Sequence, residues 1–222
     1  MWHDARLVAG KDLRLEVRSG VAVNQLAPFA LLVLVLFAFA LDPDRGVLAR
    51  ATPGLYWIAV LFSAVIAVER TFSLESADGV RDGLRLAGLE PGGVFLGKFG
   101  ALAVQLLALE VVLGVGVVLF YDRSLGGWPL LVATLVTATA AIAAAGTLYG
   151  VLASGLRVRE TLLPLLLLPA LAPVLIAATR AVEAALDGVS SEGWPWCSLL
   201  AVFAIVYLAI GTLAFGPLME ES

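Results

Sequence analysis

The sequence predicts an all-α, polytopic membrane protein, and three observations lead to this fold class. Hydrophobic residues make up 61% of the 222 residues, and charged residues make up only 14%. A soluble domain has about 45–50% apolar and about 25% charged residues, so a solvated globular protein is excluded. The apolar residues also run in long unbroken stretches, which suit membrane-spanning helices and not the short alternating strands of a membrane barrel.

Six apolar stretches are long enough to cross a bilayer, whose core of about 30 Å needs about 20 helical residues. The predicted spans are residues 21–41, 53–72, 96–121, 128–153, 161–179 and 197–217. We interpret residues 1–222 as a single transmembrane domain without a soluble domain.

The distribution of Lys and Arg predicts the orientation of these spans. Ten of the 14 basic residues fall on the side that holds both termini, and four fall on the other side. The positive-inside rule then places both termini in the cytoplasm.

The segment 1–20 is predicted to be an amphipathic helix on the membrane surface. Its apolar stripe at helical spacing consists of Trp2, Ala5, Ala9, Leu13 and Val17. Three basic residues, Lys11, Arg14 and Arg18, fall opposite, which suits contact with anionic lipid or with a partner. The alternative is a charged tail that only satisfies the positive-inside rule.

The cytoplasmic segment 69–95 is far longer than a connector between two helices needs to be. Short helical stretches punctuated by glycines predict a docking surface for a cytoplasmic protein, and the alternative is a solvated connector. The docking candidates are Glu69, Arg70, Glu75, Asp78, Gly79, Arg81 and Asp82.

The end of the same segment, from Gly92 to Lys98, matches the phosphate-binding pattern G-x-x-x-x-G-K. Phe99 follows in place of the Ser or Thr that would reach Mg²⁺, and no strand precedes the pattern. We therefore expect no ATP site in this chain; if ATP is used, another subunit supplies it. We interpret Lys98 as an anchor that reaches the membrane surface at the end of the third span.

The segment 180–196 on the opposite side is predicted to be a re-entrant or interfacial element. It contains a short helical stretch at residues 181–186 that ends at Asp187 and Gly188. Trp194 and Trp196 follow where an aromatic belt is expected.

Three polar residues inside the spans are candidates for function: Glu110, Gln105 and Thr137. A carboxylate in mid-membrane is unfavourable by about 2.5–3.5 kcal/mol on insertion scales, so it needs protonation or a polar partner. Glu110 could belong to a substrate path or proton relay. The interpretation that we favour is a hydrogen bond between helices, to Thr134, Thr137 or Thr139.

The fifth and fourth spans carry residues that affect helix geometry. Pro164, Pro169 and Pro173 are predicted to kink the fifth span, because each proline removes a backbone hydrogen bond. The pair Gly146 and Gly150 in the fourth span predicts close contact with another helix.

Residues for metal or redox chemistry are scarce. The chain has one histidine, His3, and one cysteine, Cys197. An internal disulfide is therefore excluded, and a zinc or iron–sulfur site within one chain is not expected. We expect no catalytic residue, no metal and no cofactor bound by this chain, and no axial haem ligand.

Several motifs together resemble one family, CcmB, which is the membrane subunit of a bacterial cytochrome c maturation system of the ABC type. The motifs are LDPD at 41–44, PGLYWIAVLF at 53–62, ER-x-F-x-x-E-x-x-DG at 69–79, FLGK at 95–98 and LP-x-x-x-PVLI at 168–176. The sequence departs from the family at Gly92 and Gly93, where bulkier residues are usual, and in its C-terminal tail.

The resemblance implies an ABC-2-type permease fold with six spans and an amphipathic N-terminal helix, in the inner membrane of a bacterium. It also implies a CcmA-type ATPase as partner, the subunits CcmC and CcmD, the haem chaperone CcmE, and a homodimer of the permease, without nucleic acid. Under this resemblance the segment 69–95 is expected to be the coupling helix that docks on the ATPase. ATP with Mg²⁺ and haem would then be held by the partners.

Two functions remain open under this resemblance. The chain is expected to be a mechanical coupler that links ATP hydrolysis to haem delivery and to release of the haem-loaded chaperone at the outer face. The alternative is a true permease with a dimeric path for haem or another small molecule.

Overall fold

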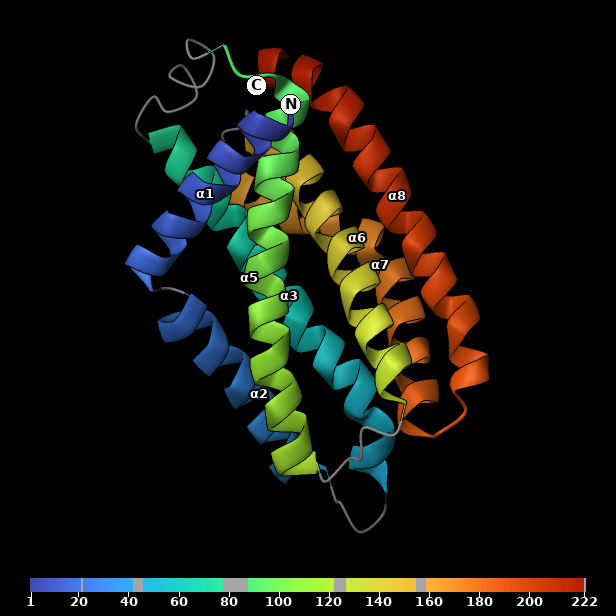
Figure 1. Ribbon diagram of the computed structural model, residues 1–222. Helices are drawn as coiled ribbons and strands as arrows, with labels where there is room; N and C mark the ends of the chain where they lie inside the picture. The colour runs from blue at the N-terminus through green and yellow to red at the C-terminus, as the bar shows by residue number, and fades with distance from the viewer. Residues whose placement is uncertain (21, 42–45, 78–87, 122–126, 155–158, 222) are drawn as a thin grey trace.

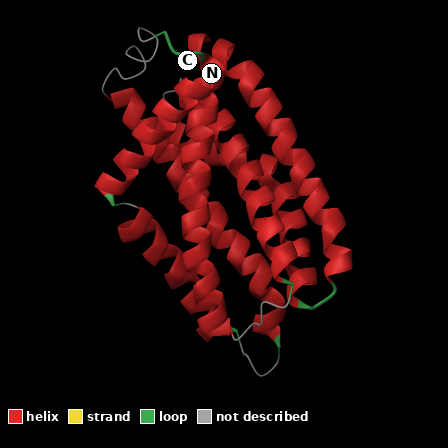
Figure 2. Cartoon of the chain, viewed as in Figure 1, coloured by secondary structure: helices red, strands yellow, loops and turns green. Residues whose placement is uncertain are grey.

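A computed structural model describes residues 1–20, 22–41, 46–77, 88–121, 127–154 and 159–221. This part of the chain is helical and contains no strand, which confirms the all-α class (Figure 2). Its helices are α1 (Trp2–Ser19), α2 (Ala27–Ala40), α3 (Val47–Ala77), α5 (Pro91–Tyr121), α6 (Trp128–Ser154), α7 (Arg159–Leu186) and α8 (Ser190–Glu221), with a short π-helix η1 (Ala22–Leu26) before α2.

Five of these helices, α3, α5, α6, α7 and α8, are long and apolar enough to cross a membrane. The helix α2 has 14 residues, or about 21 Å at 1.5 Å per residue, which is shorter than the bilayer core. Only α1 and α2 together are long and apolar enough to cross a membrane, and the chain bends by 51° between them. If this bent pair is counted as one span, the number of candidate spans is six. The polytopic helical membrane class is thus confirmed.

The spans form one bundle in which both termini lie at the same end (Figure 1). The helix α6 packs against α7 and α8 and also contacts α3 and α5. On the other side of the bundle, both α1 and α2 pack against α5. The elongated α5 therefore joins the N-terminal helices to the rest of the bundle.

Close packing of α6 on α3 confirms the helix contact predicted from Gly146 and Gly150. A Cβ atom added at Gly146 would lie 2.6 Å from Cγ2 of Val68, and one added at Gly150 would overlap the ring of Phe72. Only glycine leaves enough room for these two side chains of α3.

The helix α7 continues through Pro164, Pro169 and Pro173 without interruption. Close to the third proline, the hydroxyl of Tyr207 on α8 donates to the carbonyl of Ala170 at 3.1 Å. Such bonds from neighbouring helices make prolines tolerable inside membrane helices. The predicted kinks stay a prediction.

The separate element predicted at residues 180–196 is wrong, because residues up to Leu186 belong to α7 and residues from Ser190 belong to α8. The chain reverses within three residues at Gly188, whose φ of 78° lies in the left-handed region that favours glycine. The predicted helix end at Asp187 and Gly188 is confirmed.

The segment 69–95 also differs from the prediction of short, separate helices. Residues 69–77 continue α3. Pro91 is the first residue of α5, a position whose backbone N–H has no partner within the helix, so the proline costs no hydrogen bond there. The stretch 78–87 lies outside the described residues.

Candidate functional site

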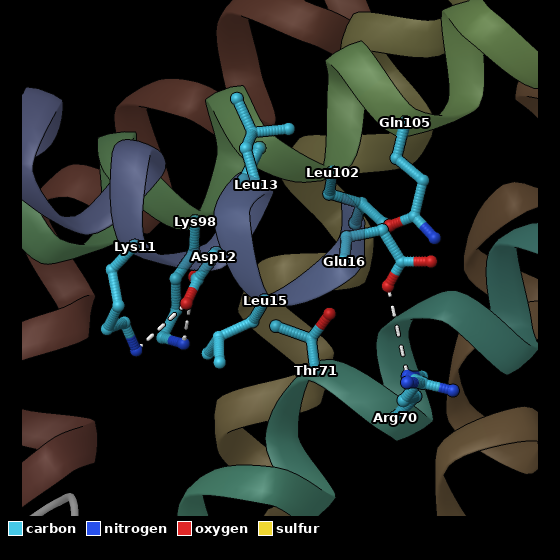
Figure 3. Close-up of a pocket in the computed structure, with 11 residues that line it drawn as sticks. Lys11, Asp12, Leu13, Leu15, Glu16, Arg70, Thr71, Lys98, Leu102 and Gln105 are labelled. Carbon is cyan, nitrogen blue, oxygen red and sulfur yellow. Dashed lines mark ion pairs between the residues drawn. The ribbon is translucent and has the colours of Figure 1, made fainter. Parts of the chain in front are cut away.

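A cluster of charged side chains lies where α1 meets α3 and α5 (Figure 3). The helix α1 lies toward the end of the bundle that holds the termini (Figure 1). Asp12 of α1 lies 3.6 Å from the Nζ atom of Lys98 on α5, and it also lies 2.8 Å from Lys11. Glu16, one turn further along α1, lies 3.8 Å from the Nε atom of Arg70 on α3. These groups surround a cavity of about 260 Å³. The cluster thus connects three helices through opposite charges.

Lys98 is at the centre of this cluster, and its side chain is only 2% exposed. Its Nζ atom lies 5.0 Å from the centre of the Phe72 ring on α3, in cation–π geometry. The prediction that Lys98 reaches the membrane surface as an anchor is therefore wrong. Asp12 and the aromatic ring compensate for the burial of its charge, which a solvent-facing lysine would not require.

Two glycines of α5, Gly93 and Gly97, allow α1 to lie against it. A Cβ atom at Gly97 would lie 2.6 Å from Cβ of Val8 and 2.7 Å from the carbonyl oxygen of Ala5. A Cβ atom at Gly93 would lie 2.8 Å from the carbonyl oxygen of Met1. The two glycines are one turn apart, so together they form a shallow seat for the backbone of α1.

The face of α1 that is buried differs in part from the predicted apolar stripe. The buried residues are Ala5 and Val8, whereas Trp2 is 74% and Val17 is 83% exposed. The helix itself is confirmed. Its packed side continues through the charged residue Asp12, which a search for apolar periodicity does not detect.

The first turn of α1 forms an ion pair and a hydrogen bond with Glu90, the residue that precedes α5. The amino group of Met1 lies 2.7 Å from Oε2 of Glu90, and the backbone N–H of Glu90 donates to Oδ2 of Asp4 at 3.3 Å. The hydrogen bond to Glu90 raises the pKa of the Met1 amino group, and the backbone donor of Glu90 lowers the pKa of Asp4. Both groups therefore stay charged at neutral pH.

Glu110 lies inside the bundle with 1% of its surface exposed. The hydroxyl of Thr139 on α6 donates to its Oε1 atom at 2.7 Å, and the hydroxyl of Tyr56 donates to its backbone carbonyl at 3.1 Å. The expected hydrogen bond to a threonine of the fourth span is thus present. Its partner is Thr139, the last of the three candidate threonines.

The three polar candidates of the spans are not brought together. Gln105 lines the charged cavity, and its Nε2 atom has no hydrogen-bond partner among the described residues. Thr137 donates to the carbonyl of Ala133 at 2.7 Å and lies 3.6 Å from Sγ of Cys197 on α8. Glu110 lines a second cavity of about 410 Å³.

The structure describes only some of the residues of the segment 69–95 that are predicted to dock on the ATPase. Glu69, Arg70 and Glu75 lie in the last turns of α3, and Arg70 turns toward Glu16 of α1. Asp78, Gly79, Arg81 and Asp82 lie outside the described residues. The residues that the sequence did not reveal are Asp12 and Glu16, although their spacing of one helical turn places them on one face of α1.

Comparisons with known proteins cover nearly the whole chain. The family model described as "CcmB protein" matches residues 5–222. "Heme exporter protein B" of Paracoccus denitrificans is 33% identical over 93% of this chain and 92% of that protein. The proteins of the same name from Haemophilus influenzae and Bradyrhizobium diazoefficiens are 31% and 30% identical, over 79% and 92% of this chain and 79% and 91% of their own lengths. The chain therefore belongs to the CcmB family.

Proposed function

We propose that the chain is the membrane subunit of a haem-exporter ABC complex for c-type cytochrome biogenesis. In this proposal a separate CcmA-type ATPase hydrolyses ATP, and the chain transmits the resulting motion through the membrane. The motion drives haem delivery and release of the haem-loaded chaperone CcmE, together with CcmC and CcmD. The names of the relatives support the haem-exporter part, because all of those cited carry the name "Heme exporter protein B".

The charged cluster between α1, α3 and α5 is the observation that supports a role in coupling. Its ion pairs, Asp12 with Lys98 and Glu16 with Arg70, join three helices at one end of the bundle. A displacement of the end of α3 therefore also acts on α1 and on α5. Because α3 and α5 each have 31 residues, such a displacement reaches the far end of the bundle through continuous helices.

The alternative of a path through one chain has less support. Gln105 and Glu110, five residues apart on α5, line two cavities that share no lining residue. Between them α5 buries Leu106 and Leu109, which are 0% and 5% exposed. If the chain is a permease, its path is therefore expected to lie between two copies of the chain.

Reversal of the charges at Glu16 and Arg70 tests the coupling role. Glu16→Arg places two cations face to face and should reduce cytochrome c maturation, while the amount of inserted protein and co-purification of the ATPase stay normal. The double variant Glu16→Arg with Arg70→Glu restores opposite charges and should restore maturation.

A matched control uses the ion pair of Arg180 and Glu183, which are 2.9 Å apart and 59% and 40% exposed. An exposed pair contributes about 0–1 kcal/mol, so Glu183→Arg should leave maturation unchanged. Normal maturation in Glu16→Arg would contradict the coupling role.

A second experiment concerns docking of the ATPase. Asp78→Lys combined with Gly79→Pro should release the ATPase or uncouple its hydrolysis, because loss of one partner of a buried interface charge pair costs about 2–5 kcal/mol. Pull-down of the ATPase from detergent extracts measures the effect. Undiminished binding with normal maturation would identify the segment 69–95 as a plain connector.

A further inference from the structure

The charged residues of α1 are sorted between the two sides of the helix. Its three carboxylates turn toward the bundle, and each has a partner outside α1. The pairs are Asp4 with the backbone N–H of Glu90, Asp12 with Lys98 and Glu16 with Arg70. The three arginines of α1, Arg6, Arg14 and Arg18, are exposed and form no ion pair with the part of the chain that the structure describes. Contact with the bundle therefore neutralises the carboxylates and leaves the arginines available.

The arginines share one side of α1. An α-helix turns by about 100° per residue, so Arg14 lies about 80° and Arg18 about 120° around the axis from Arg6. Gly10 falls between Arg6 and Arg14, and a Cβ atom there would meet nothing within 4 Å. The same sector contains two apolar side chains, Leu7 and Val17, which are 53% and 83% exposed. The outer side of α1 consists of Arg6, Leu7, Gly10, Arg14, Val17 and Arg18.

The inner contacts of α1 place this side at the edge of the apolar part of the bundle. Residues 51–68 of α3 and 99–109 of α5 contain no charged residue, and Arg70 and Lys98 lie just beyond these stretches. Both cations pair with α1, which lies along the outside of α5 (Figure 1). In a bilayer, the edge of the hydrocarbon is the level of the lipid head groups.

We propose that the outer side of α1 binds anionic phospholipids. The gap at Gly10 leaves room for a phosphate group between Arg6 and Arg14, and the planar guanidinium groups donate paired hydrogen bonds to phosphate oxygens. Leu7 and Val17 contact the acyl chains beside the head group. A helix with basic and apolar residues interleaved in this way suits the surface of an anionic bilayer.

The exposed apolar residues favour lipid over an acidic protein as the occupant. Leu7 and Val17 lie among the arginines at the level where head groups meet hydrocarbon, and there a bilayer covers them without a further partner. A zwitterionic lipid also carries a phosphate group, but its ammonium group offsets the attraction to the arginines. The inference concerns lipid binding alone, so it stands independently of the proposed role in coupling.

Fluorescence of Trp2 provides the test, because Trp2 lies one turn before Arg6 and is 74% exposed. The full chain is reconstituted in phosphatidylcholine nanodiscs, and a rising fraction of the lipid is replaced by phosphatidylglycerol brominated at carbons 6 and 7 of its acyl chains. Bromine quenches tryptophan on contact, and the quenching that Trp2→Phe removes is the contribution of α1. Brominated phosphatidylcholine is titrated in the same way for comparison.

We expect half-maximal quenching of Trp2 at a roughly 25-fold lower fraction of phosphatidylglycerol than of phosphatidylcholine. Each arginine near an anionic surface contributes about fivefold, and two arginines flank the gap. Arg14→Gln should raise the half-maximal fraction of phosphatidylglycerol about fivefold, whereas Arg14→Lys, which keeps the charge, should stay close to the parent. Gly10→Glu should weaken binding at least as much as Arg14→Gln, because it places a carboxylate in the gap.

A matched control removes one positive charge at the other end of the bundle. Arg180 is 59% exposed, and Arg180→Gln should leave the quenching of Trp2 unchanged. Equal half-maximal fractions for the two lipids would overturn the inference. Equal effects of Arg14→Gln and Arg180→Gln would mean that the net charge of the protein, and not a site on α1, attracts the lipid. Quenching of Trp2 by aqueous acrylamide, with none by either brominated lipid, would mean that this side faces water and suits an acidic protein instead.

Discussion

Replacement of Gly97 by alanine tests whether α1 is seated on α5 through glycine. The added Cβ atom would lie 2.6 Å from Cβ of Val8 and 2.7 Å from the carbonyl oxygen of Ala5. Carbon atoms in contact are usually about 3.5–4.0 Å apart, so α1 must withdraw by roughly 1 Å. The contacted oxygen belongs to the backbone, so a side-chain rotation cannot relieve the overlap.

The expected size of the effect follows from the overlap alone. Overpacking costs about 1–3 kcal/mol. The gain of about 1 kcal/mol for Gly→Ala inside a helix stabilises α5 whether or not α1 is docked, so Gly97→Ala should destabilise the docked α1 by about 1–3 kcal/mol. Gly100→Ala, at a position where a Cβ atom meets nothing within 4 Å, should show only the gain.

Hydrogen–deuterium exchange of residues 2–19 in detergent measures this difference. A loss of about 1–3 kcal/mol in local stability should accelerate exchange in α1 by roughly 5–150-fold in Gly97→Ala. Gly100→Ala should exchange as the parent does. Equal protection of α1 in both alanine variants would refute the glycine seat.

Three further predictions concern topology, the buried carboxyl group and haem ligation. In a Cys197→Ala background, Ser191→Cys should react with an impermeant maleimide in intact cells, and Ser19→Cys should react only after permeabilisation; external labelling of Ser19→Cys would reverse the assigned orientation. Glu110→Gln should retain cytochrome c maturation, because the amide oxygen still accepts the threonine hydrogen bond; complete loss at normal protein levels would assign a charge or proton role. His3→Ala and Cys197→Ala should each support normal maturation, and failure of either at normal expression would indicate a haem ligand in this chain.

The sequence predicted the helical class because each span carries its own signal in local hydropathy. The boundaries were less predictable, since α3 extends from Val47 to Ala77 and α5 begins at Pro91, well outside their apolar cores. A helix continues into polar sequence wherever nothing stops it, and hydropathy does not report that continuation.

The charged cluster escaped prediction because it depends on contacts between distant parts of the chain. Lys98 resembles a surface anchor until Asp12 and Phe72 are placed beside it. Gly93 resembles part of a flexible loop until the backbone of α1 is placed against it. For Glu110 the sequence restricted the partner to three threonines, because a buried carboxyl group requires a polar neighbour, and only the packing of α6 selected Thr139.

The seat of α1 on α5 has a consequence for the timing of synthesis. Lys98 leaves the ribosome roughly 86 residues after Asp12, which at about 5–20 residues per second is a delay of roughly 4–17 s. During this delay α1 has been made but its binding surface has not. The carboxylates of Asp12 and Glu16 keep this face of α1 compatible with water until Arg70 of α3, and then Lys98 of α5, are made and can pair with them.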